Sequence, residues 1–113
     1  MNFSKYHAKP VTIDGIRFAS KKEGSRYCEL KALTRAGKIS DLQLQVPFIL
    51  SKAHRRTGEK RMTSGKKYIA DFVYYDCINK RQVVEDVKGF RTKEYLVKRE
   101  WMFEKYGIEI HEV

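Results

Sequence analysis

The sequence predicts an α/β fold in which a small hairpin is followed by a helix, three strands, a second helix and a last strand. Two observations predict it. Two segments carry apolar residues at the helical period between capping signals, and the β-branched and aromatic runs around them alternate at the period of a strand. A length of 113 residues with 42% apolar content is enough for one hydrophobic core and too short for two. Residues 1–113 are therefore expected to form a single domain.

The strands are predicted from turn signals and alternation. Residues 1–19 are expected to form a basic arm and a tight hairpin, because Asp14-Gly15 between two short apolar runs favours a two-residue turn. Further on, residues 39–45 alternate as a half-buried strand, which Pro47 is expected to bend or end. The remaining strands are expected at 68–75, 82–88 and 108–113.

The two helices are predicted from their ends. Ser20 and Glu23 have the spacing of a capping box at the start of the first helix, and Gly37 ends it. The second helix is expected to begin after Thr92 and to stop at Gly107. The apolar stripes are expected to be Tyr27, Leu30, Ala32, Leu33 and Ala36 in the first helix, and Tyr95, Leu96, Trp101 or Met102, Phe103 and Tyr106 in the second. The aromatic residues of the second helix are interpreted as core.

The most informative feature is a pair of acidic patches in the two middle strands. A hairpin whose turn is centred between Ile78 and Asn79 places Asp71 directly opposite Asp86. Side chains two apart on a strand share a face, so Lys88 projects on the same side as Asp86. Like charges that face each other across a sheet are destabilising. A fold tolerates this arrangement most easily when a divalent cation lies between the two carboxylates.

These residues predict a metal site that can cleave phosphodiester bonds. Mg²⁺ prefers oxygen ligands, which Asp71, Asp86 and the backbone carbonyl of Val87 can supply together with a substrate phosphate. The metal would polarise the phosphate and lower the pKa of an attacking water, and Mn²⁺ is expected to substitute for it. Lys88 would add positive charge where negative charge develops. The alternative is a surface hairpin in which Asp86 and Lys88 form a solvated ion pair.

The charge of the chain predicts an anionic partner. A net charge of +10 and a pI near 9.7 favour a nucleic acid over a membrane surface, since no apolar run approaches the roughly 18 residues of a spanning helix. Cys28 and Cys77 stand alone, which predicts a reduced, cytoplasmic chain without structural zinc. The segment 51–67 is expected to be a mobile, irregular basic loop that follows DNA phosphates, although a solvated charge run is the alternative. The expected DNA-binding residues are Lys52, Arg55, Arg56, Lys60, Arg61, Lys66, Lys67, Arg91 and Lys93, with Lys98 and Arg99 extending the track.

The chain resembles the PD-(D/E)xK nuclease superfamily over residues 16–113, most closely the phage endonuclease I-type Holliday-junction resolvases and related small phage proteins. Five motifs follow in the family order. They are Phe18-Ala-Ser20-Lys-Lys-Glu23, Val46-Pro47-Phe48, Ala70-Asp71, Asp71-Phe72 and Asp86-Val-Lys88-Gly89. The resemblance implies a restriction-endonuclease-like αβββαβ core, a mixed sheet flanked by helices.

The resemblance also implies that Glu23 reaches the metal site as a third acid, whereas the residues by themselves indicate a helix cap. The chain departs from the family pattern in two places: Ala70 replaces the usual proline, and Asp86 replaces the commoner glutamate. Glu85 points to the opposite face by strand alternation, and it is the fallback ligand if a bulge shifts the register.

The hypothesis from sequence is a Mg²⁺-dependent DNA endonuclease that selects branched, nicked or duplex DNA by structure more than by sequence, in phage recombination or DNA processing. One site cuts one strand, so a homodimer is expected. Two alternatives remain open. The chain could be a non-catalytic DNA-binding accessory protein on a nuclease scaffold, or a nuclease subunit of a larger complex.

Overall fold

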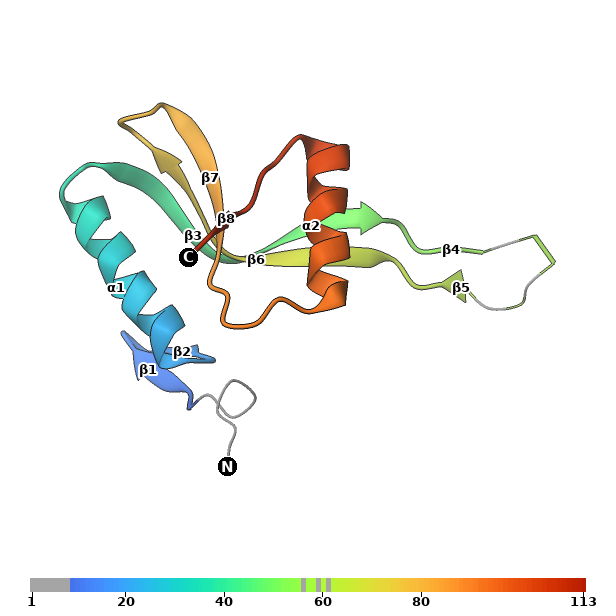
Figure 1. The fold of residues 1–113 in the computed structure, drawn as a ribbon, viewed down its shortest axis with the longest axis horizontal. Helices are drawn as coiled ribbons and strands as arrows, with labels where there is room; N and C mark the ends of the chain where they lie inside the picture. The colour runs from blue at the N-terminus through green and yellow to red at the C-terminus, as the bar shows by residue number, and fades with distance from the viewer. Residues whose placement is uncertain (1–8, 56, 59, 61) are drawn as a thin grey trace.

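The computed structural model describes residues 9–113 except 56, 59 and 61, and it is an α/β structure with a mixed four-stranded sheet, two helices and a small antiparallel hairpin (Figure 1). The order of strands in the sheet is β3-β6-β7-β8, antiparallel except that β8 is parallel to β7. The elements are β1 (Val11–Ile13), β2 (Ile16–Phe18), α1 (Lys21–Arg35), β3 (Ile39–Ser51), β4 (His54–Arg55), β5 (Met62–Thr63), β6 (Lys66–Asp76), β7 (Arg81–Asp86), α2 (Lys93–Tyr106) and β8 (His111–Glu112). The α/β class and the predicted order of helices and core strands are confirmed.

The N-terminal hairpin and α1 form as their local signals predict. Asp14 and Gly15 both have left-handed φ angles, 54° and 76°, which match the right-handed twist of the flanking strands β1 and β2. Ser20 caps α1, because its Oγ accepts a hydrogen bond from the Glu23 amide at 3.1 Å. At Gly24 an added Cβ would lie 2.8 Å from a methyl group of Val11, so the helix approaches the hairpin closely.

The second helix has the predicted ends but a narrower buried stripe. Thr92 Oγ1 accepts a hydrogen bond from the Tyr95 amide at 3.0 Å, and Gly107 ends the helix at a φ of 67°. The buried residues of α2 are Tyr95 and Met102, seven positions apart and therefore on one line along the helix. The prediction that the buried stripe includes Leu96, Phe103 and Tyr106 was wrong, since these residues are 37%, 50% and 42% exposed. Among the described residues neither helix is long and apolar enough to cross a membrane.

Pro47 does not end its strand, contrary to that part of the prediction. The strand β3 continues through Pro47, which pairs with Ile69 of β6, and ends at Ser51. Among the described strands, β3 lies at the edge of the sheet and has β6 as its one neighbour. A proline in an edge strand can turn its donor-less nitrogen away from the ladder, and this is the physical reason that the strand continues.

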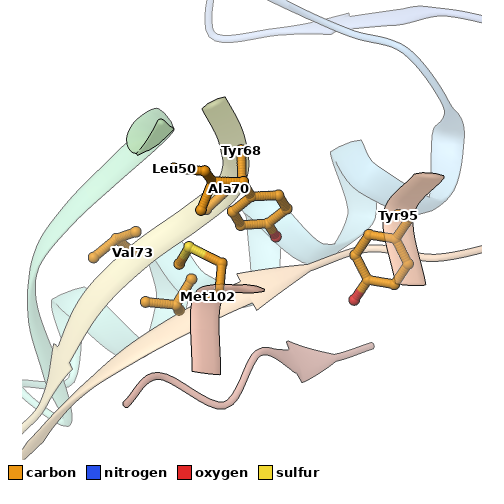
Figure 2. Close-up of a cluster of buried hydrophobic side chains, with 7 residues drawn as sticks. Leu50, Tyr68, Ala70, Val73, Tyr95 and Met102 are labelled. Carbon is orange, nitrogen blue, oxygen red and sulfur yellow. The ribbon is translucent and has the colours of Figure 1, made fainter. Parts of the chain in front are cut away.

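The side chains of β6 change their alternation at Asp71. Tyr68 and Ala70 belong to the cluster packed against α2, which Figure 2 shows, whereas Phe72 belongs to the cluster packed against α1. The neighbouring strand β3 changes in the same place, at Gln45, which has a left-handed φ of 53°. On both strands, the side chains that face α1 and those that face α2 therefore exchange places at the pair Gln45 and Asp71. The sheet turns at this pair, and Asp71 lies where the two layers meet.

The segment 51–67 is more regular than predicted. Within its described part, β3 extends to Ser51, β6 begins at Lys66, and the short strands β4 and β5 pair between them. Together they form a two-stranded arm that extends past α2 (Figure 1). The Lys66 amide donates to Ser51 Oγ at 3.2 Å at the base of the arm. The sequence did not reveal this pairing because the segment has no apolar alternation.

Gly65→Ala tests the close approach at the base of the arm. An added Cβ would lie 2.7 Å from the Ser51 carbonyl oxygen, a backbone atom that cannot swing aside. We expect the free energy of unfolding to fall by about 1–3 kcal/mol in urea titrations, as for overpacking. Gly89→Ala is the matched control, since nothing lies within 4 Å of an added Cβ there and its φ is ordinary. Equal stability of the two variants would contradict the described arm.

Candidate functional site

The pairing of β6 with β7 has the predicted register. Phe72 pairs with Glu85 and Asp76 with Arg81, so the next positions in the same register are Asp71 and Asp86. The two carboxyl groups are close enough to interact directly. The hairpin therefore brings the two acids together as its turn predicted.

The Asp71 side chain is half-buried and is held by both neighbouring strands. Its Oδ2 accepts a hydrogen bond from the Val87 amide at 2.9 Å. Its Oδ1 accepts one from Gln45 Nε2 at 3.3 Å. Val87, predicted to contribute its carbonyl, thus lies at the site and orients Asp71 through its amide.

The Asp86 side chain is buried, with 3% of its surface exposed. Its Oδ2 accepts a hydrogen bond from the hydroxyl of Tyr68 at 2.7 Å and forms an ion pair with Lys88 Nζ at 3.1 Å. Lys88 lies on the same side of the sheet as Asp86, as the period of two predicts. Asp86 and Lys88 thus form the ion pair that the alternative expected, but its carboxylate is buried and not solvated.

The pair of carboxyl groups holds protons more tightly than isolated aspartates do. Burial, reinforced by the neighbouring Asp71 carboxyl, raises the pKa of Asp86 to about 7. Burial likewise raises the pKa of Asp71, against the opposing effects of Asp86 and the Val87 amide. Two like charges in a partly desolvated place favour either a shared proton or a bound cation between them.

Glu23 takes part in the cap of α1, and its side chain also lies beside the pair of aspartates. Its amide donates to Ser20 Oγ in the helix cap, and its Oε1 accepts a hydrogen bond from the Ala19 amide at 3.0 Å. Its Oε2 lies 3.5 Å from Gln45 Nε2, the same nitrogen that donates to Asp71. The Glu23 carboxylate also raises the pKa of Asp71. The first helix therefore places a third, buried carboxyl beside the pair.

The acids form one wall of an open groove of about 480 Å³ between the N-terminal ends of the two helices. Lys67 and Lys98 also line it, and within the part of the chain that the structure describes neither of them forms an ion pair. An anionic ligand in this groove would meet three lysine ammonium groups, those of Lys67, Lys88 and Lys98. A larger groove, about 700 Å³, lies between β7 and residues 107–111 and contains none of the predicted site acids.

Glu85 lies on the other face of β7, as alternation predicts, and takes no part in the groove. It is fully buried, and its two oxygens accept hydrogen bonds from Arg26 of α1 at 2.8 and 2.7 Å. The hydroxyl of Tyr74 donates to the same carboxylate. Since no bulge shifts the register, the fallback role of Glu85 as a ligand is not needed.

The predicted DNA-binding residues are spread over the structure. Lys67 lines the groove, and Arg91 forms hydrogen bonds of 2.9 and 2.6 Å with Glu112. Arg56 and Arg61 lie outside the described residues. The others are exposed: Lys52 after β3, Arg55 in β4, Lys60 between β4 and β5, Lys66 in β6 and Lys93 at the start of α2.

Three residues of the site were missed by the sequence analysis: Gln45, Tyr68 and Tyr95. Gln45 is one polar residue of an alternating strand, so nothing local distinguishes it. Tyr68 contacts a carboxylate 18 positions away, and Tyr95 lies under Lys88 with 3.9 Å between the ammonium and the ring centroid. Their roles depend on long-range contacts, which only the fold shows.

The all-oxygen donor set fits Mg²⁺, or Mn²⁺ in its place, more closely than the softer transition metals that prefer nitrogen and sulfur ligands. Over the described residues, no three His, Cys, Asp or Glu side chains are gathered closely enough to form a complete metal cage. Mg²⁺ needs no such cage, because it usually binds through one or two carboxylates and keeps waters or substrate phosphate oxygens. The facing carboxylates of Asp71 and Asp86, open to a groove, meet this requirement.

The fold and the site define a small basic α/β protein in which a carboxylate pair and a lysine lie at one groove of a mixed sheet. The chain belongs to DUF1064, a family described as proteins of unknown function, whose family model matches residues 3–111. No curated protein and no solved structure matches the chain.

Proposed function

We propose that this protein is a Mg²⁺-dependent DNA endonuclease. The observation that carries the proposal is the arrangement of Asp71, Asp86 and Lys88, in which two carboxyl groups face each other and an ammonium group lies 3.1 Å from one of them. A buried like-charge pair is costly to a fold, so its presence in a groove favours a functional role.

The order of elements supports a restriction-endonuclease-like core. One acid lies on the second strand of the sequence β3, β6, β7 and the Asp-x-Lys motif follows on the third, with α1 before and α2 after. This is the order that the resemblance to the PD-(D/E)xK superfamily implies. The mixed sheet, with β8 parallel to β7, agrees with it.

The residues have distinct roles in the proposed reaction. Asp71 and Asp86, with the Val87 carbonyl, would hold Mg²⁺, or Mn²⁺ in its place, and Glu23 would add a third negative charge beside Asp71. When bound, the metal supplies positive charge to the scissile phosphate and lowers the pKa of an attacking water. Lys88 stabilises the charge that develops on the phosphate oxygens. Tyr68 and Gln45 keep the two aspartates in their orientation.

Charge supports DNA as the substrate. The chain carries 24 Lys and Arg residues against 14 Asp and Glu residues. In the groove, Lys88 is paired with Asp86, whereas Lys67 and Lys98 form no ion pair with the described residues. Lysine ammonium groups bind phosphates without reading bases, which favours selection by DNA structure over selection by sequence. We further propose that the protein acts on branched or nicked duplex DNA in the cytoplasm of a phage host. Because one such site cuts one strand, we propose that it acts as a homodimer.

The proposal is tested by incubating purified protein with labelled four-way junction, flap, nicked and linear duplex DNA. Cleavage is expected with Mg²⁺ or Mn²⁺ and is expected to cease with EDTA. DNA binding without cleavage of any substrate would favour the accessory-protein alternative and would overturn the proposal. Cleavage that occurs only with added partner proteins would favour a subunit of a larger complex.

Glu23→Gln tests the role of the third carboxyl. Glutamine can serve at this position of a helix cap, so the melting temperature is expected to stay close to that of the wild type. The cleavage rate is expected to fall by at least about tenfold, because a negative charge beside Asp71 is lost. Ser20→Ala is the control for the cap and is expected to destabilise the helix by about 1 kcal/mol. Normal cleavage by Glu23→Gln would show that Glu23 is only a cap.

The arm is tested by salt dependence. Replacing Lys52, Arg55 and Lys60 with alanine is expected to weaken binding to all DNA substrates about equally. The slope of log K against log salt should flatten by roughly 0.9 for each phosphate that the variant no longer binds, up to about 3 units in all. The melting temperature should barely change because the three side chains are exposed. Lys38→Ala is the matched control, because Lys38 is an exposed lysine three residues after the end of α1. An unchanged slope in the arm variant would place the arm off the DNA path.

A further inference from the structure

The ammonium group of Lys88 is held between two partners. It lies 3.1 Å from Asp86 Oδ2 and 3.9 Å from the centroid of the Tyr95 ring, and 23% of the Lys88 side chain is exposed. An ammonium group over the face of an aromatic ring is attracted by the ring quadrupole. A lysine side chain otherwise samples many rotamers, so a group that fixes it reduces the entropy lost in reaching a reactive geometry.

Tyr95 is itself held both at its backbone and at the hydroxyl of its ring. At one end its backbone amide donates to the helix cap Thr92, and at the other its hydroxyl donates to Glu112 Oε2 at 2.6 Å. Glu112 also accepts hydrogen bonds from Arg91 and Arg99, at 2.6 and 3.1 Å for the shortest of each. The ring is buried, with 6% of the residue exposed. Burial and hydrogen bonds at both its backbone and its hydroxyl therefore hold the ring under Lys88 in place.

The helix α2 carries a second lysine–tyrosine contact that is looser and far from the acids. Lys105 Nζ lies 5.8 Å from the ring centroid of Tyr106, which is 42% exposed. Lys105 donates to the Leu50 carbonyl at 3.3 Å instead of to a carboxylate. This contact provides a control of the same chemistry on the same helix.

We propose that Tyr95 is a positioning residue: its ring, clamped by Glu112, holds the Lys88 ammonium beside Asp86 at the place of the scissile phosphate. The inference rests on the proposed nuclease function for its effect on rate. The contact between Tyr95 and Lys88 can be tested without it. Sequence alone indicated only a core aromatic at position 95.

The first measurement is the chemical reactivity of Lys88. Wild-type protein and variants are labelled briefly with acetic anhydride, and mass spectrometry compares acetylation of Lys88 with that of exposed Lys38. Tyr95→Leu removes the ring and is expected to raise the relative reactivity of Lys88 by about threefold to tenfold. Tyr95→Phe keeps the ring and is expected to stay within about twofold of wild type. Tyr106→Leu controls for loss of an aromatic residue from α2 and should leave Lys88 protected.

The second measurement is single-turnover cleavage of the best substrate. Tyr95→Leu is expected to slow the cleavage step by about tenfold with little change in DNA affinity, and Tyr95→Phe is expected to recover most of the rate. In a Lys88→Met background Tyr95→Leu should cause no further loss, because the ring acts through Lys88. If Tyr95→Leu does not fold, Tyr95→Met replaces it in both measurements.

The outcomes separate the inference from the proposed function. Unchanged Lys88 reactivity in Tyr95→Leu would overturn the inference whether or not the protein cuts DNA. The same loss of rate in the Lys88→Met background as in the wild type would also overturn it. Raised reactivity of Lys88 together with no cleavage by the wild type would support the positioning role and overturn the nuclease function.

Discussion

Asp86→Asn is expected to abolish cleavage and, at the same time, to stabilise the metal-free protein. The substitution removes a metal ligand and a charge at the groove, so the rate should fall at least about 10²-fold, or about 3 kcal/mol. Asp71→Asn should have a similar effect on the rate. DNA binding should be retained or tightened, because a negative charge that faces the phosphates is lost.

The gain in stability follows from the pKa of Asp86, which burial and Asp71 raise to about 7 from an ordinary value of 3.8. The folded protein therefore holds a proton that the unfolded chain has lost. Ionisation costs the folded state nothing below pH 4, and the cost grows until it is complete above pH 7. The melting temperature of Asp86→Asn should exceed that of the wild type by a few degrees at pH 8, and the difference should vanish near pH 4.

Thermal melts at several pH values, with and without Mg²⁺, check this prediction. Mg²⁺ should raise the melting temperature of the wild type and have little effect on Asp86→Asn. Glu109→Gln, which removes an exposed acid elsewhere, is the matched control for net charge. Substantial cleavage by Asp86→Asn would show that the metal site lies elsewhere, and a variant less stable than the wild type at pH 8 would contradict the cost of the carboxylate pair.

The largest loss of stability is expected when the ion pair of Arg26 and Glu85 is broken. Glu85 is fully buried, and the Arg26 side chain is 19% exposed. Removing Arg26 therefore leaves a buried carboxylate that keeps, among the described residues, the hydroxyl of Tyr74 as a partner. Arg26→Met is expected to cost about 3–5 kcal/mol, as for other broken buried pairs. This is a large part of the stability of a domain of this size.

A double-mutant cycle in urea unfolding tests the pair. The variant Arg26→Met with Glu85→Met should recover much of the loss, since two apolar side chains can replace a buried ion pair at little cost. The exposed pair of Lys31 and Asp14 is the matched control, and Lys31→Met should change stability little. If the Arg26 and Glu85 substitutions are additive, the pair does not join α1 to the sheet as described.

These two predictions concern adjacent residues of one strand with opposite roles. Glu85 faces α1 and joins the helix that carries Glu23 to the sheet, whereas Asp86 faces the groove. The period of two places neighbouring side chains on opposite faces, so a short Glu-Asp sequence provides both an anchor and a site residue. A shift of one residue in the register would exchange the faces on which Glu85 and Asp86 lie.

The sequence by itself determined the local structure and the pairing that it controls. Ser20, Thr92 and Gly107 set the ends of the helices through caps, and Asp14-Gly15 set the first turn, because these signals act over a few residues. The register of β6 with β7 was also predictable, since one short turn connects them. The proximity of Asp71, Asp86 and Lys88 follows from that register and from alternation.

Only the tertiary structure decided the contacts between segments that are far apart in the sequence. It shows that Pro47 remains in an edge strand, that the arm is a paired ribbon, and that the sheet turns at Gln45 and Asp71. It also shows that Tyr95 supports Lys88. Each of these depends on a partner far along the chain or on which side of a strand has a neighbour. Local propensity carries no information about either, because burial and long-range pairing are properties of the assembled sheet and helices.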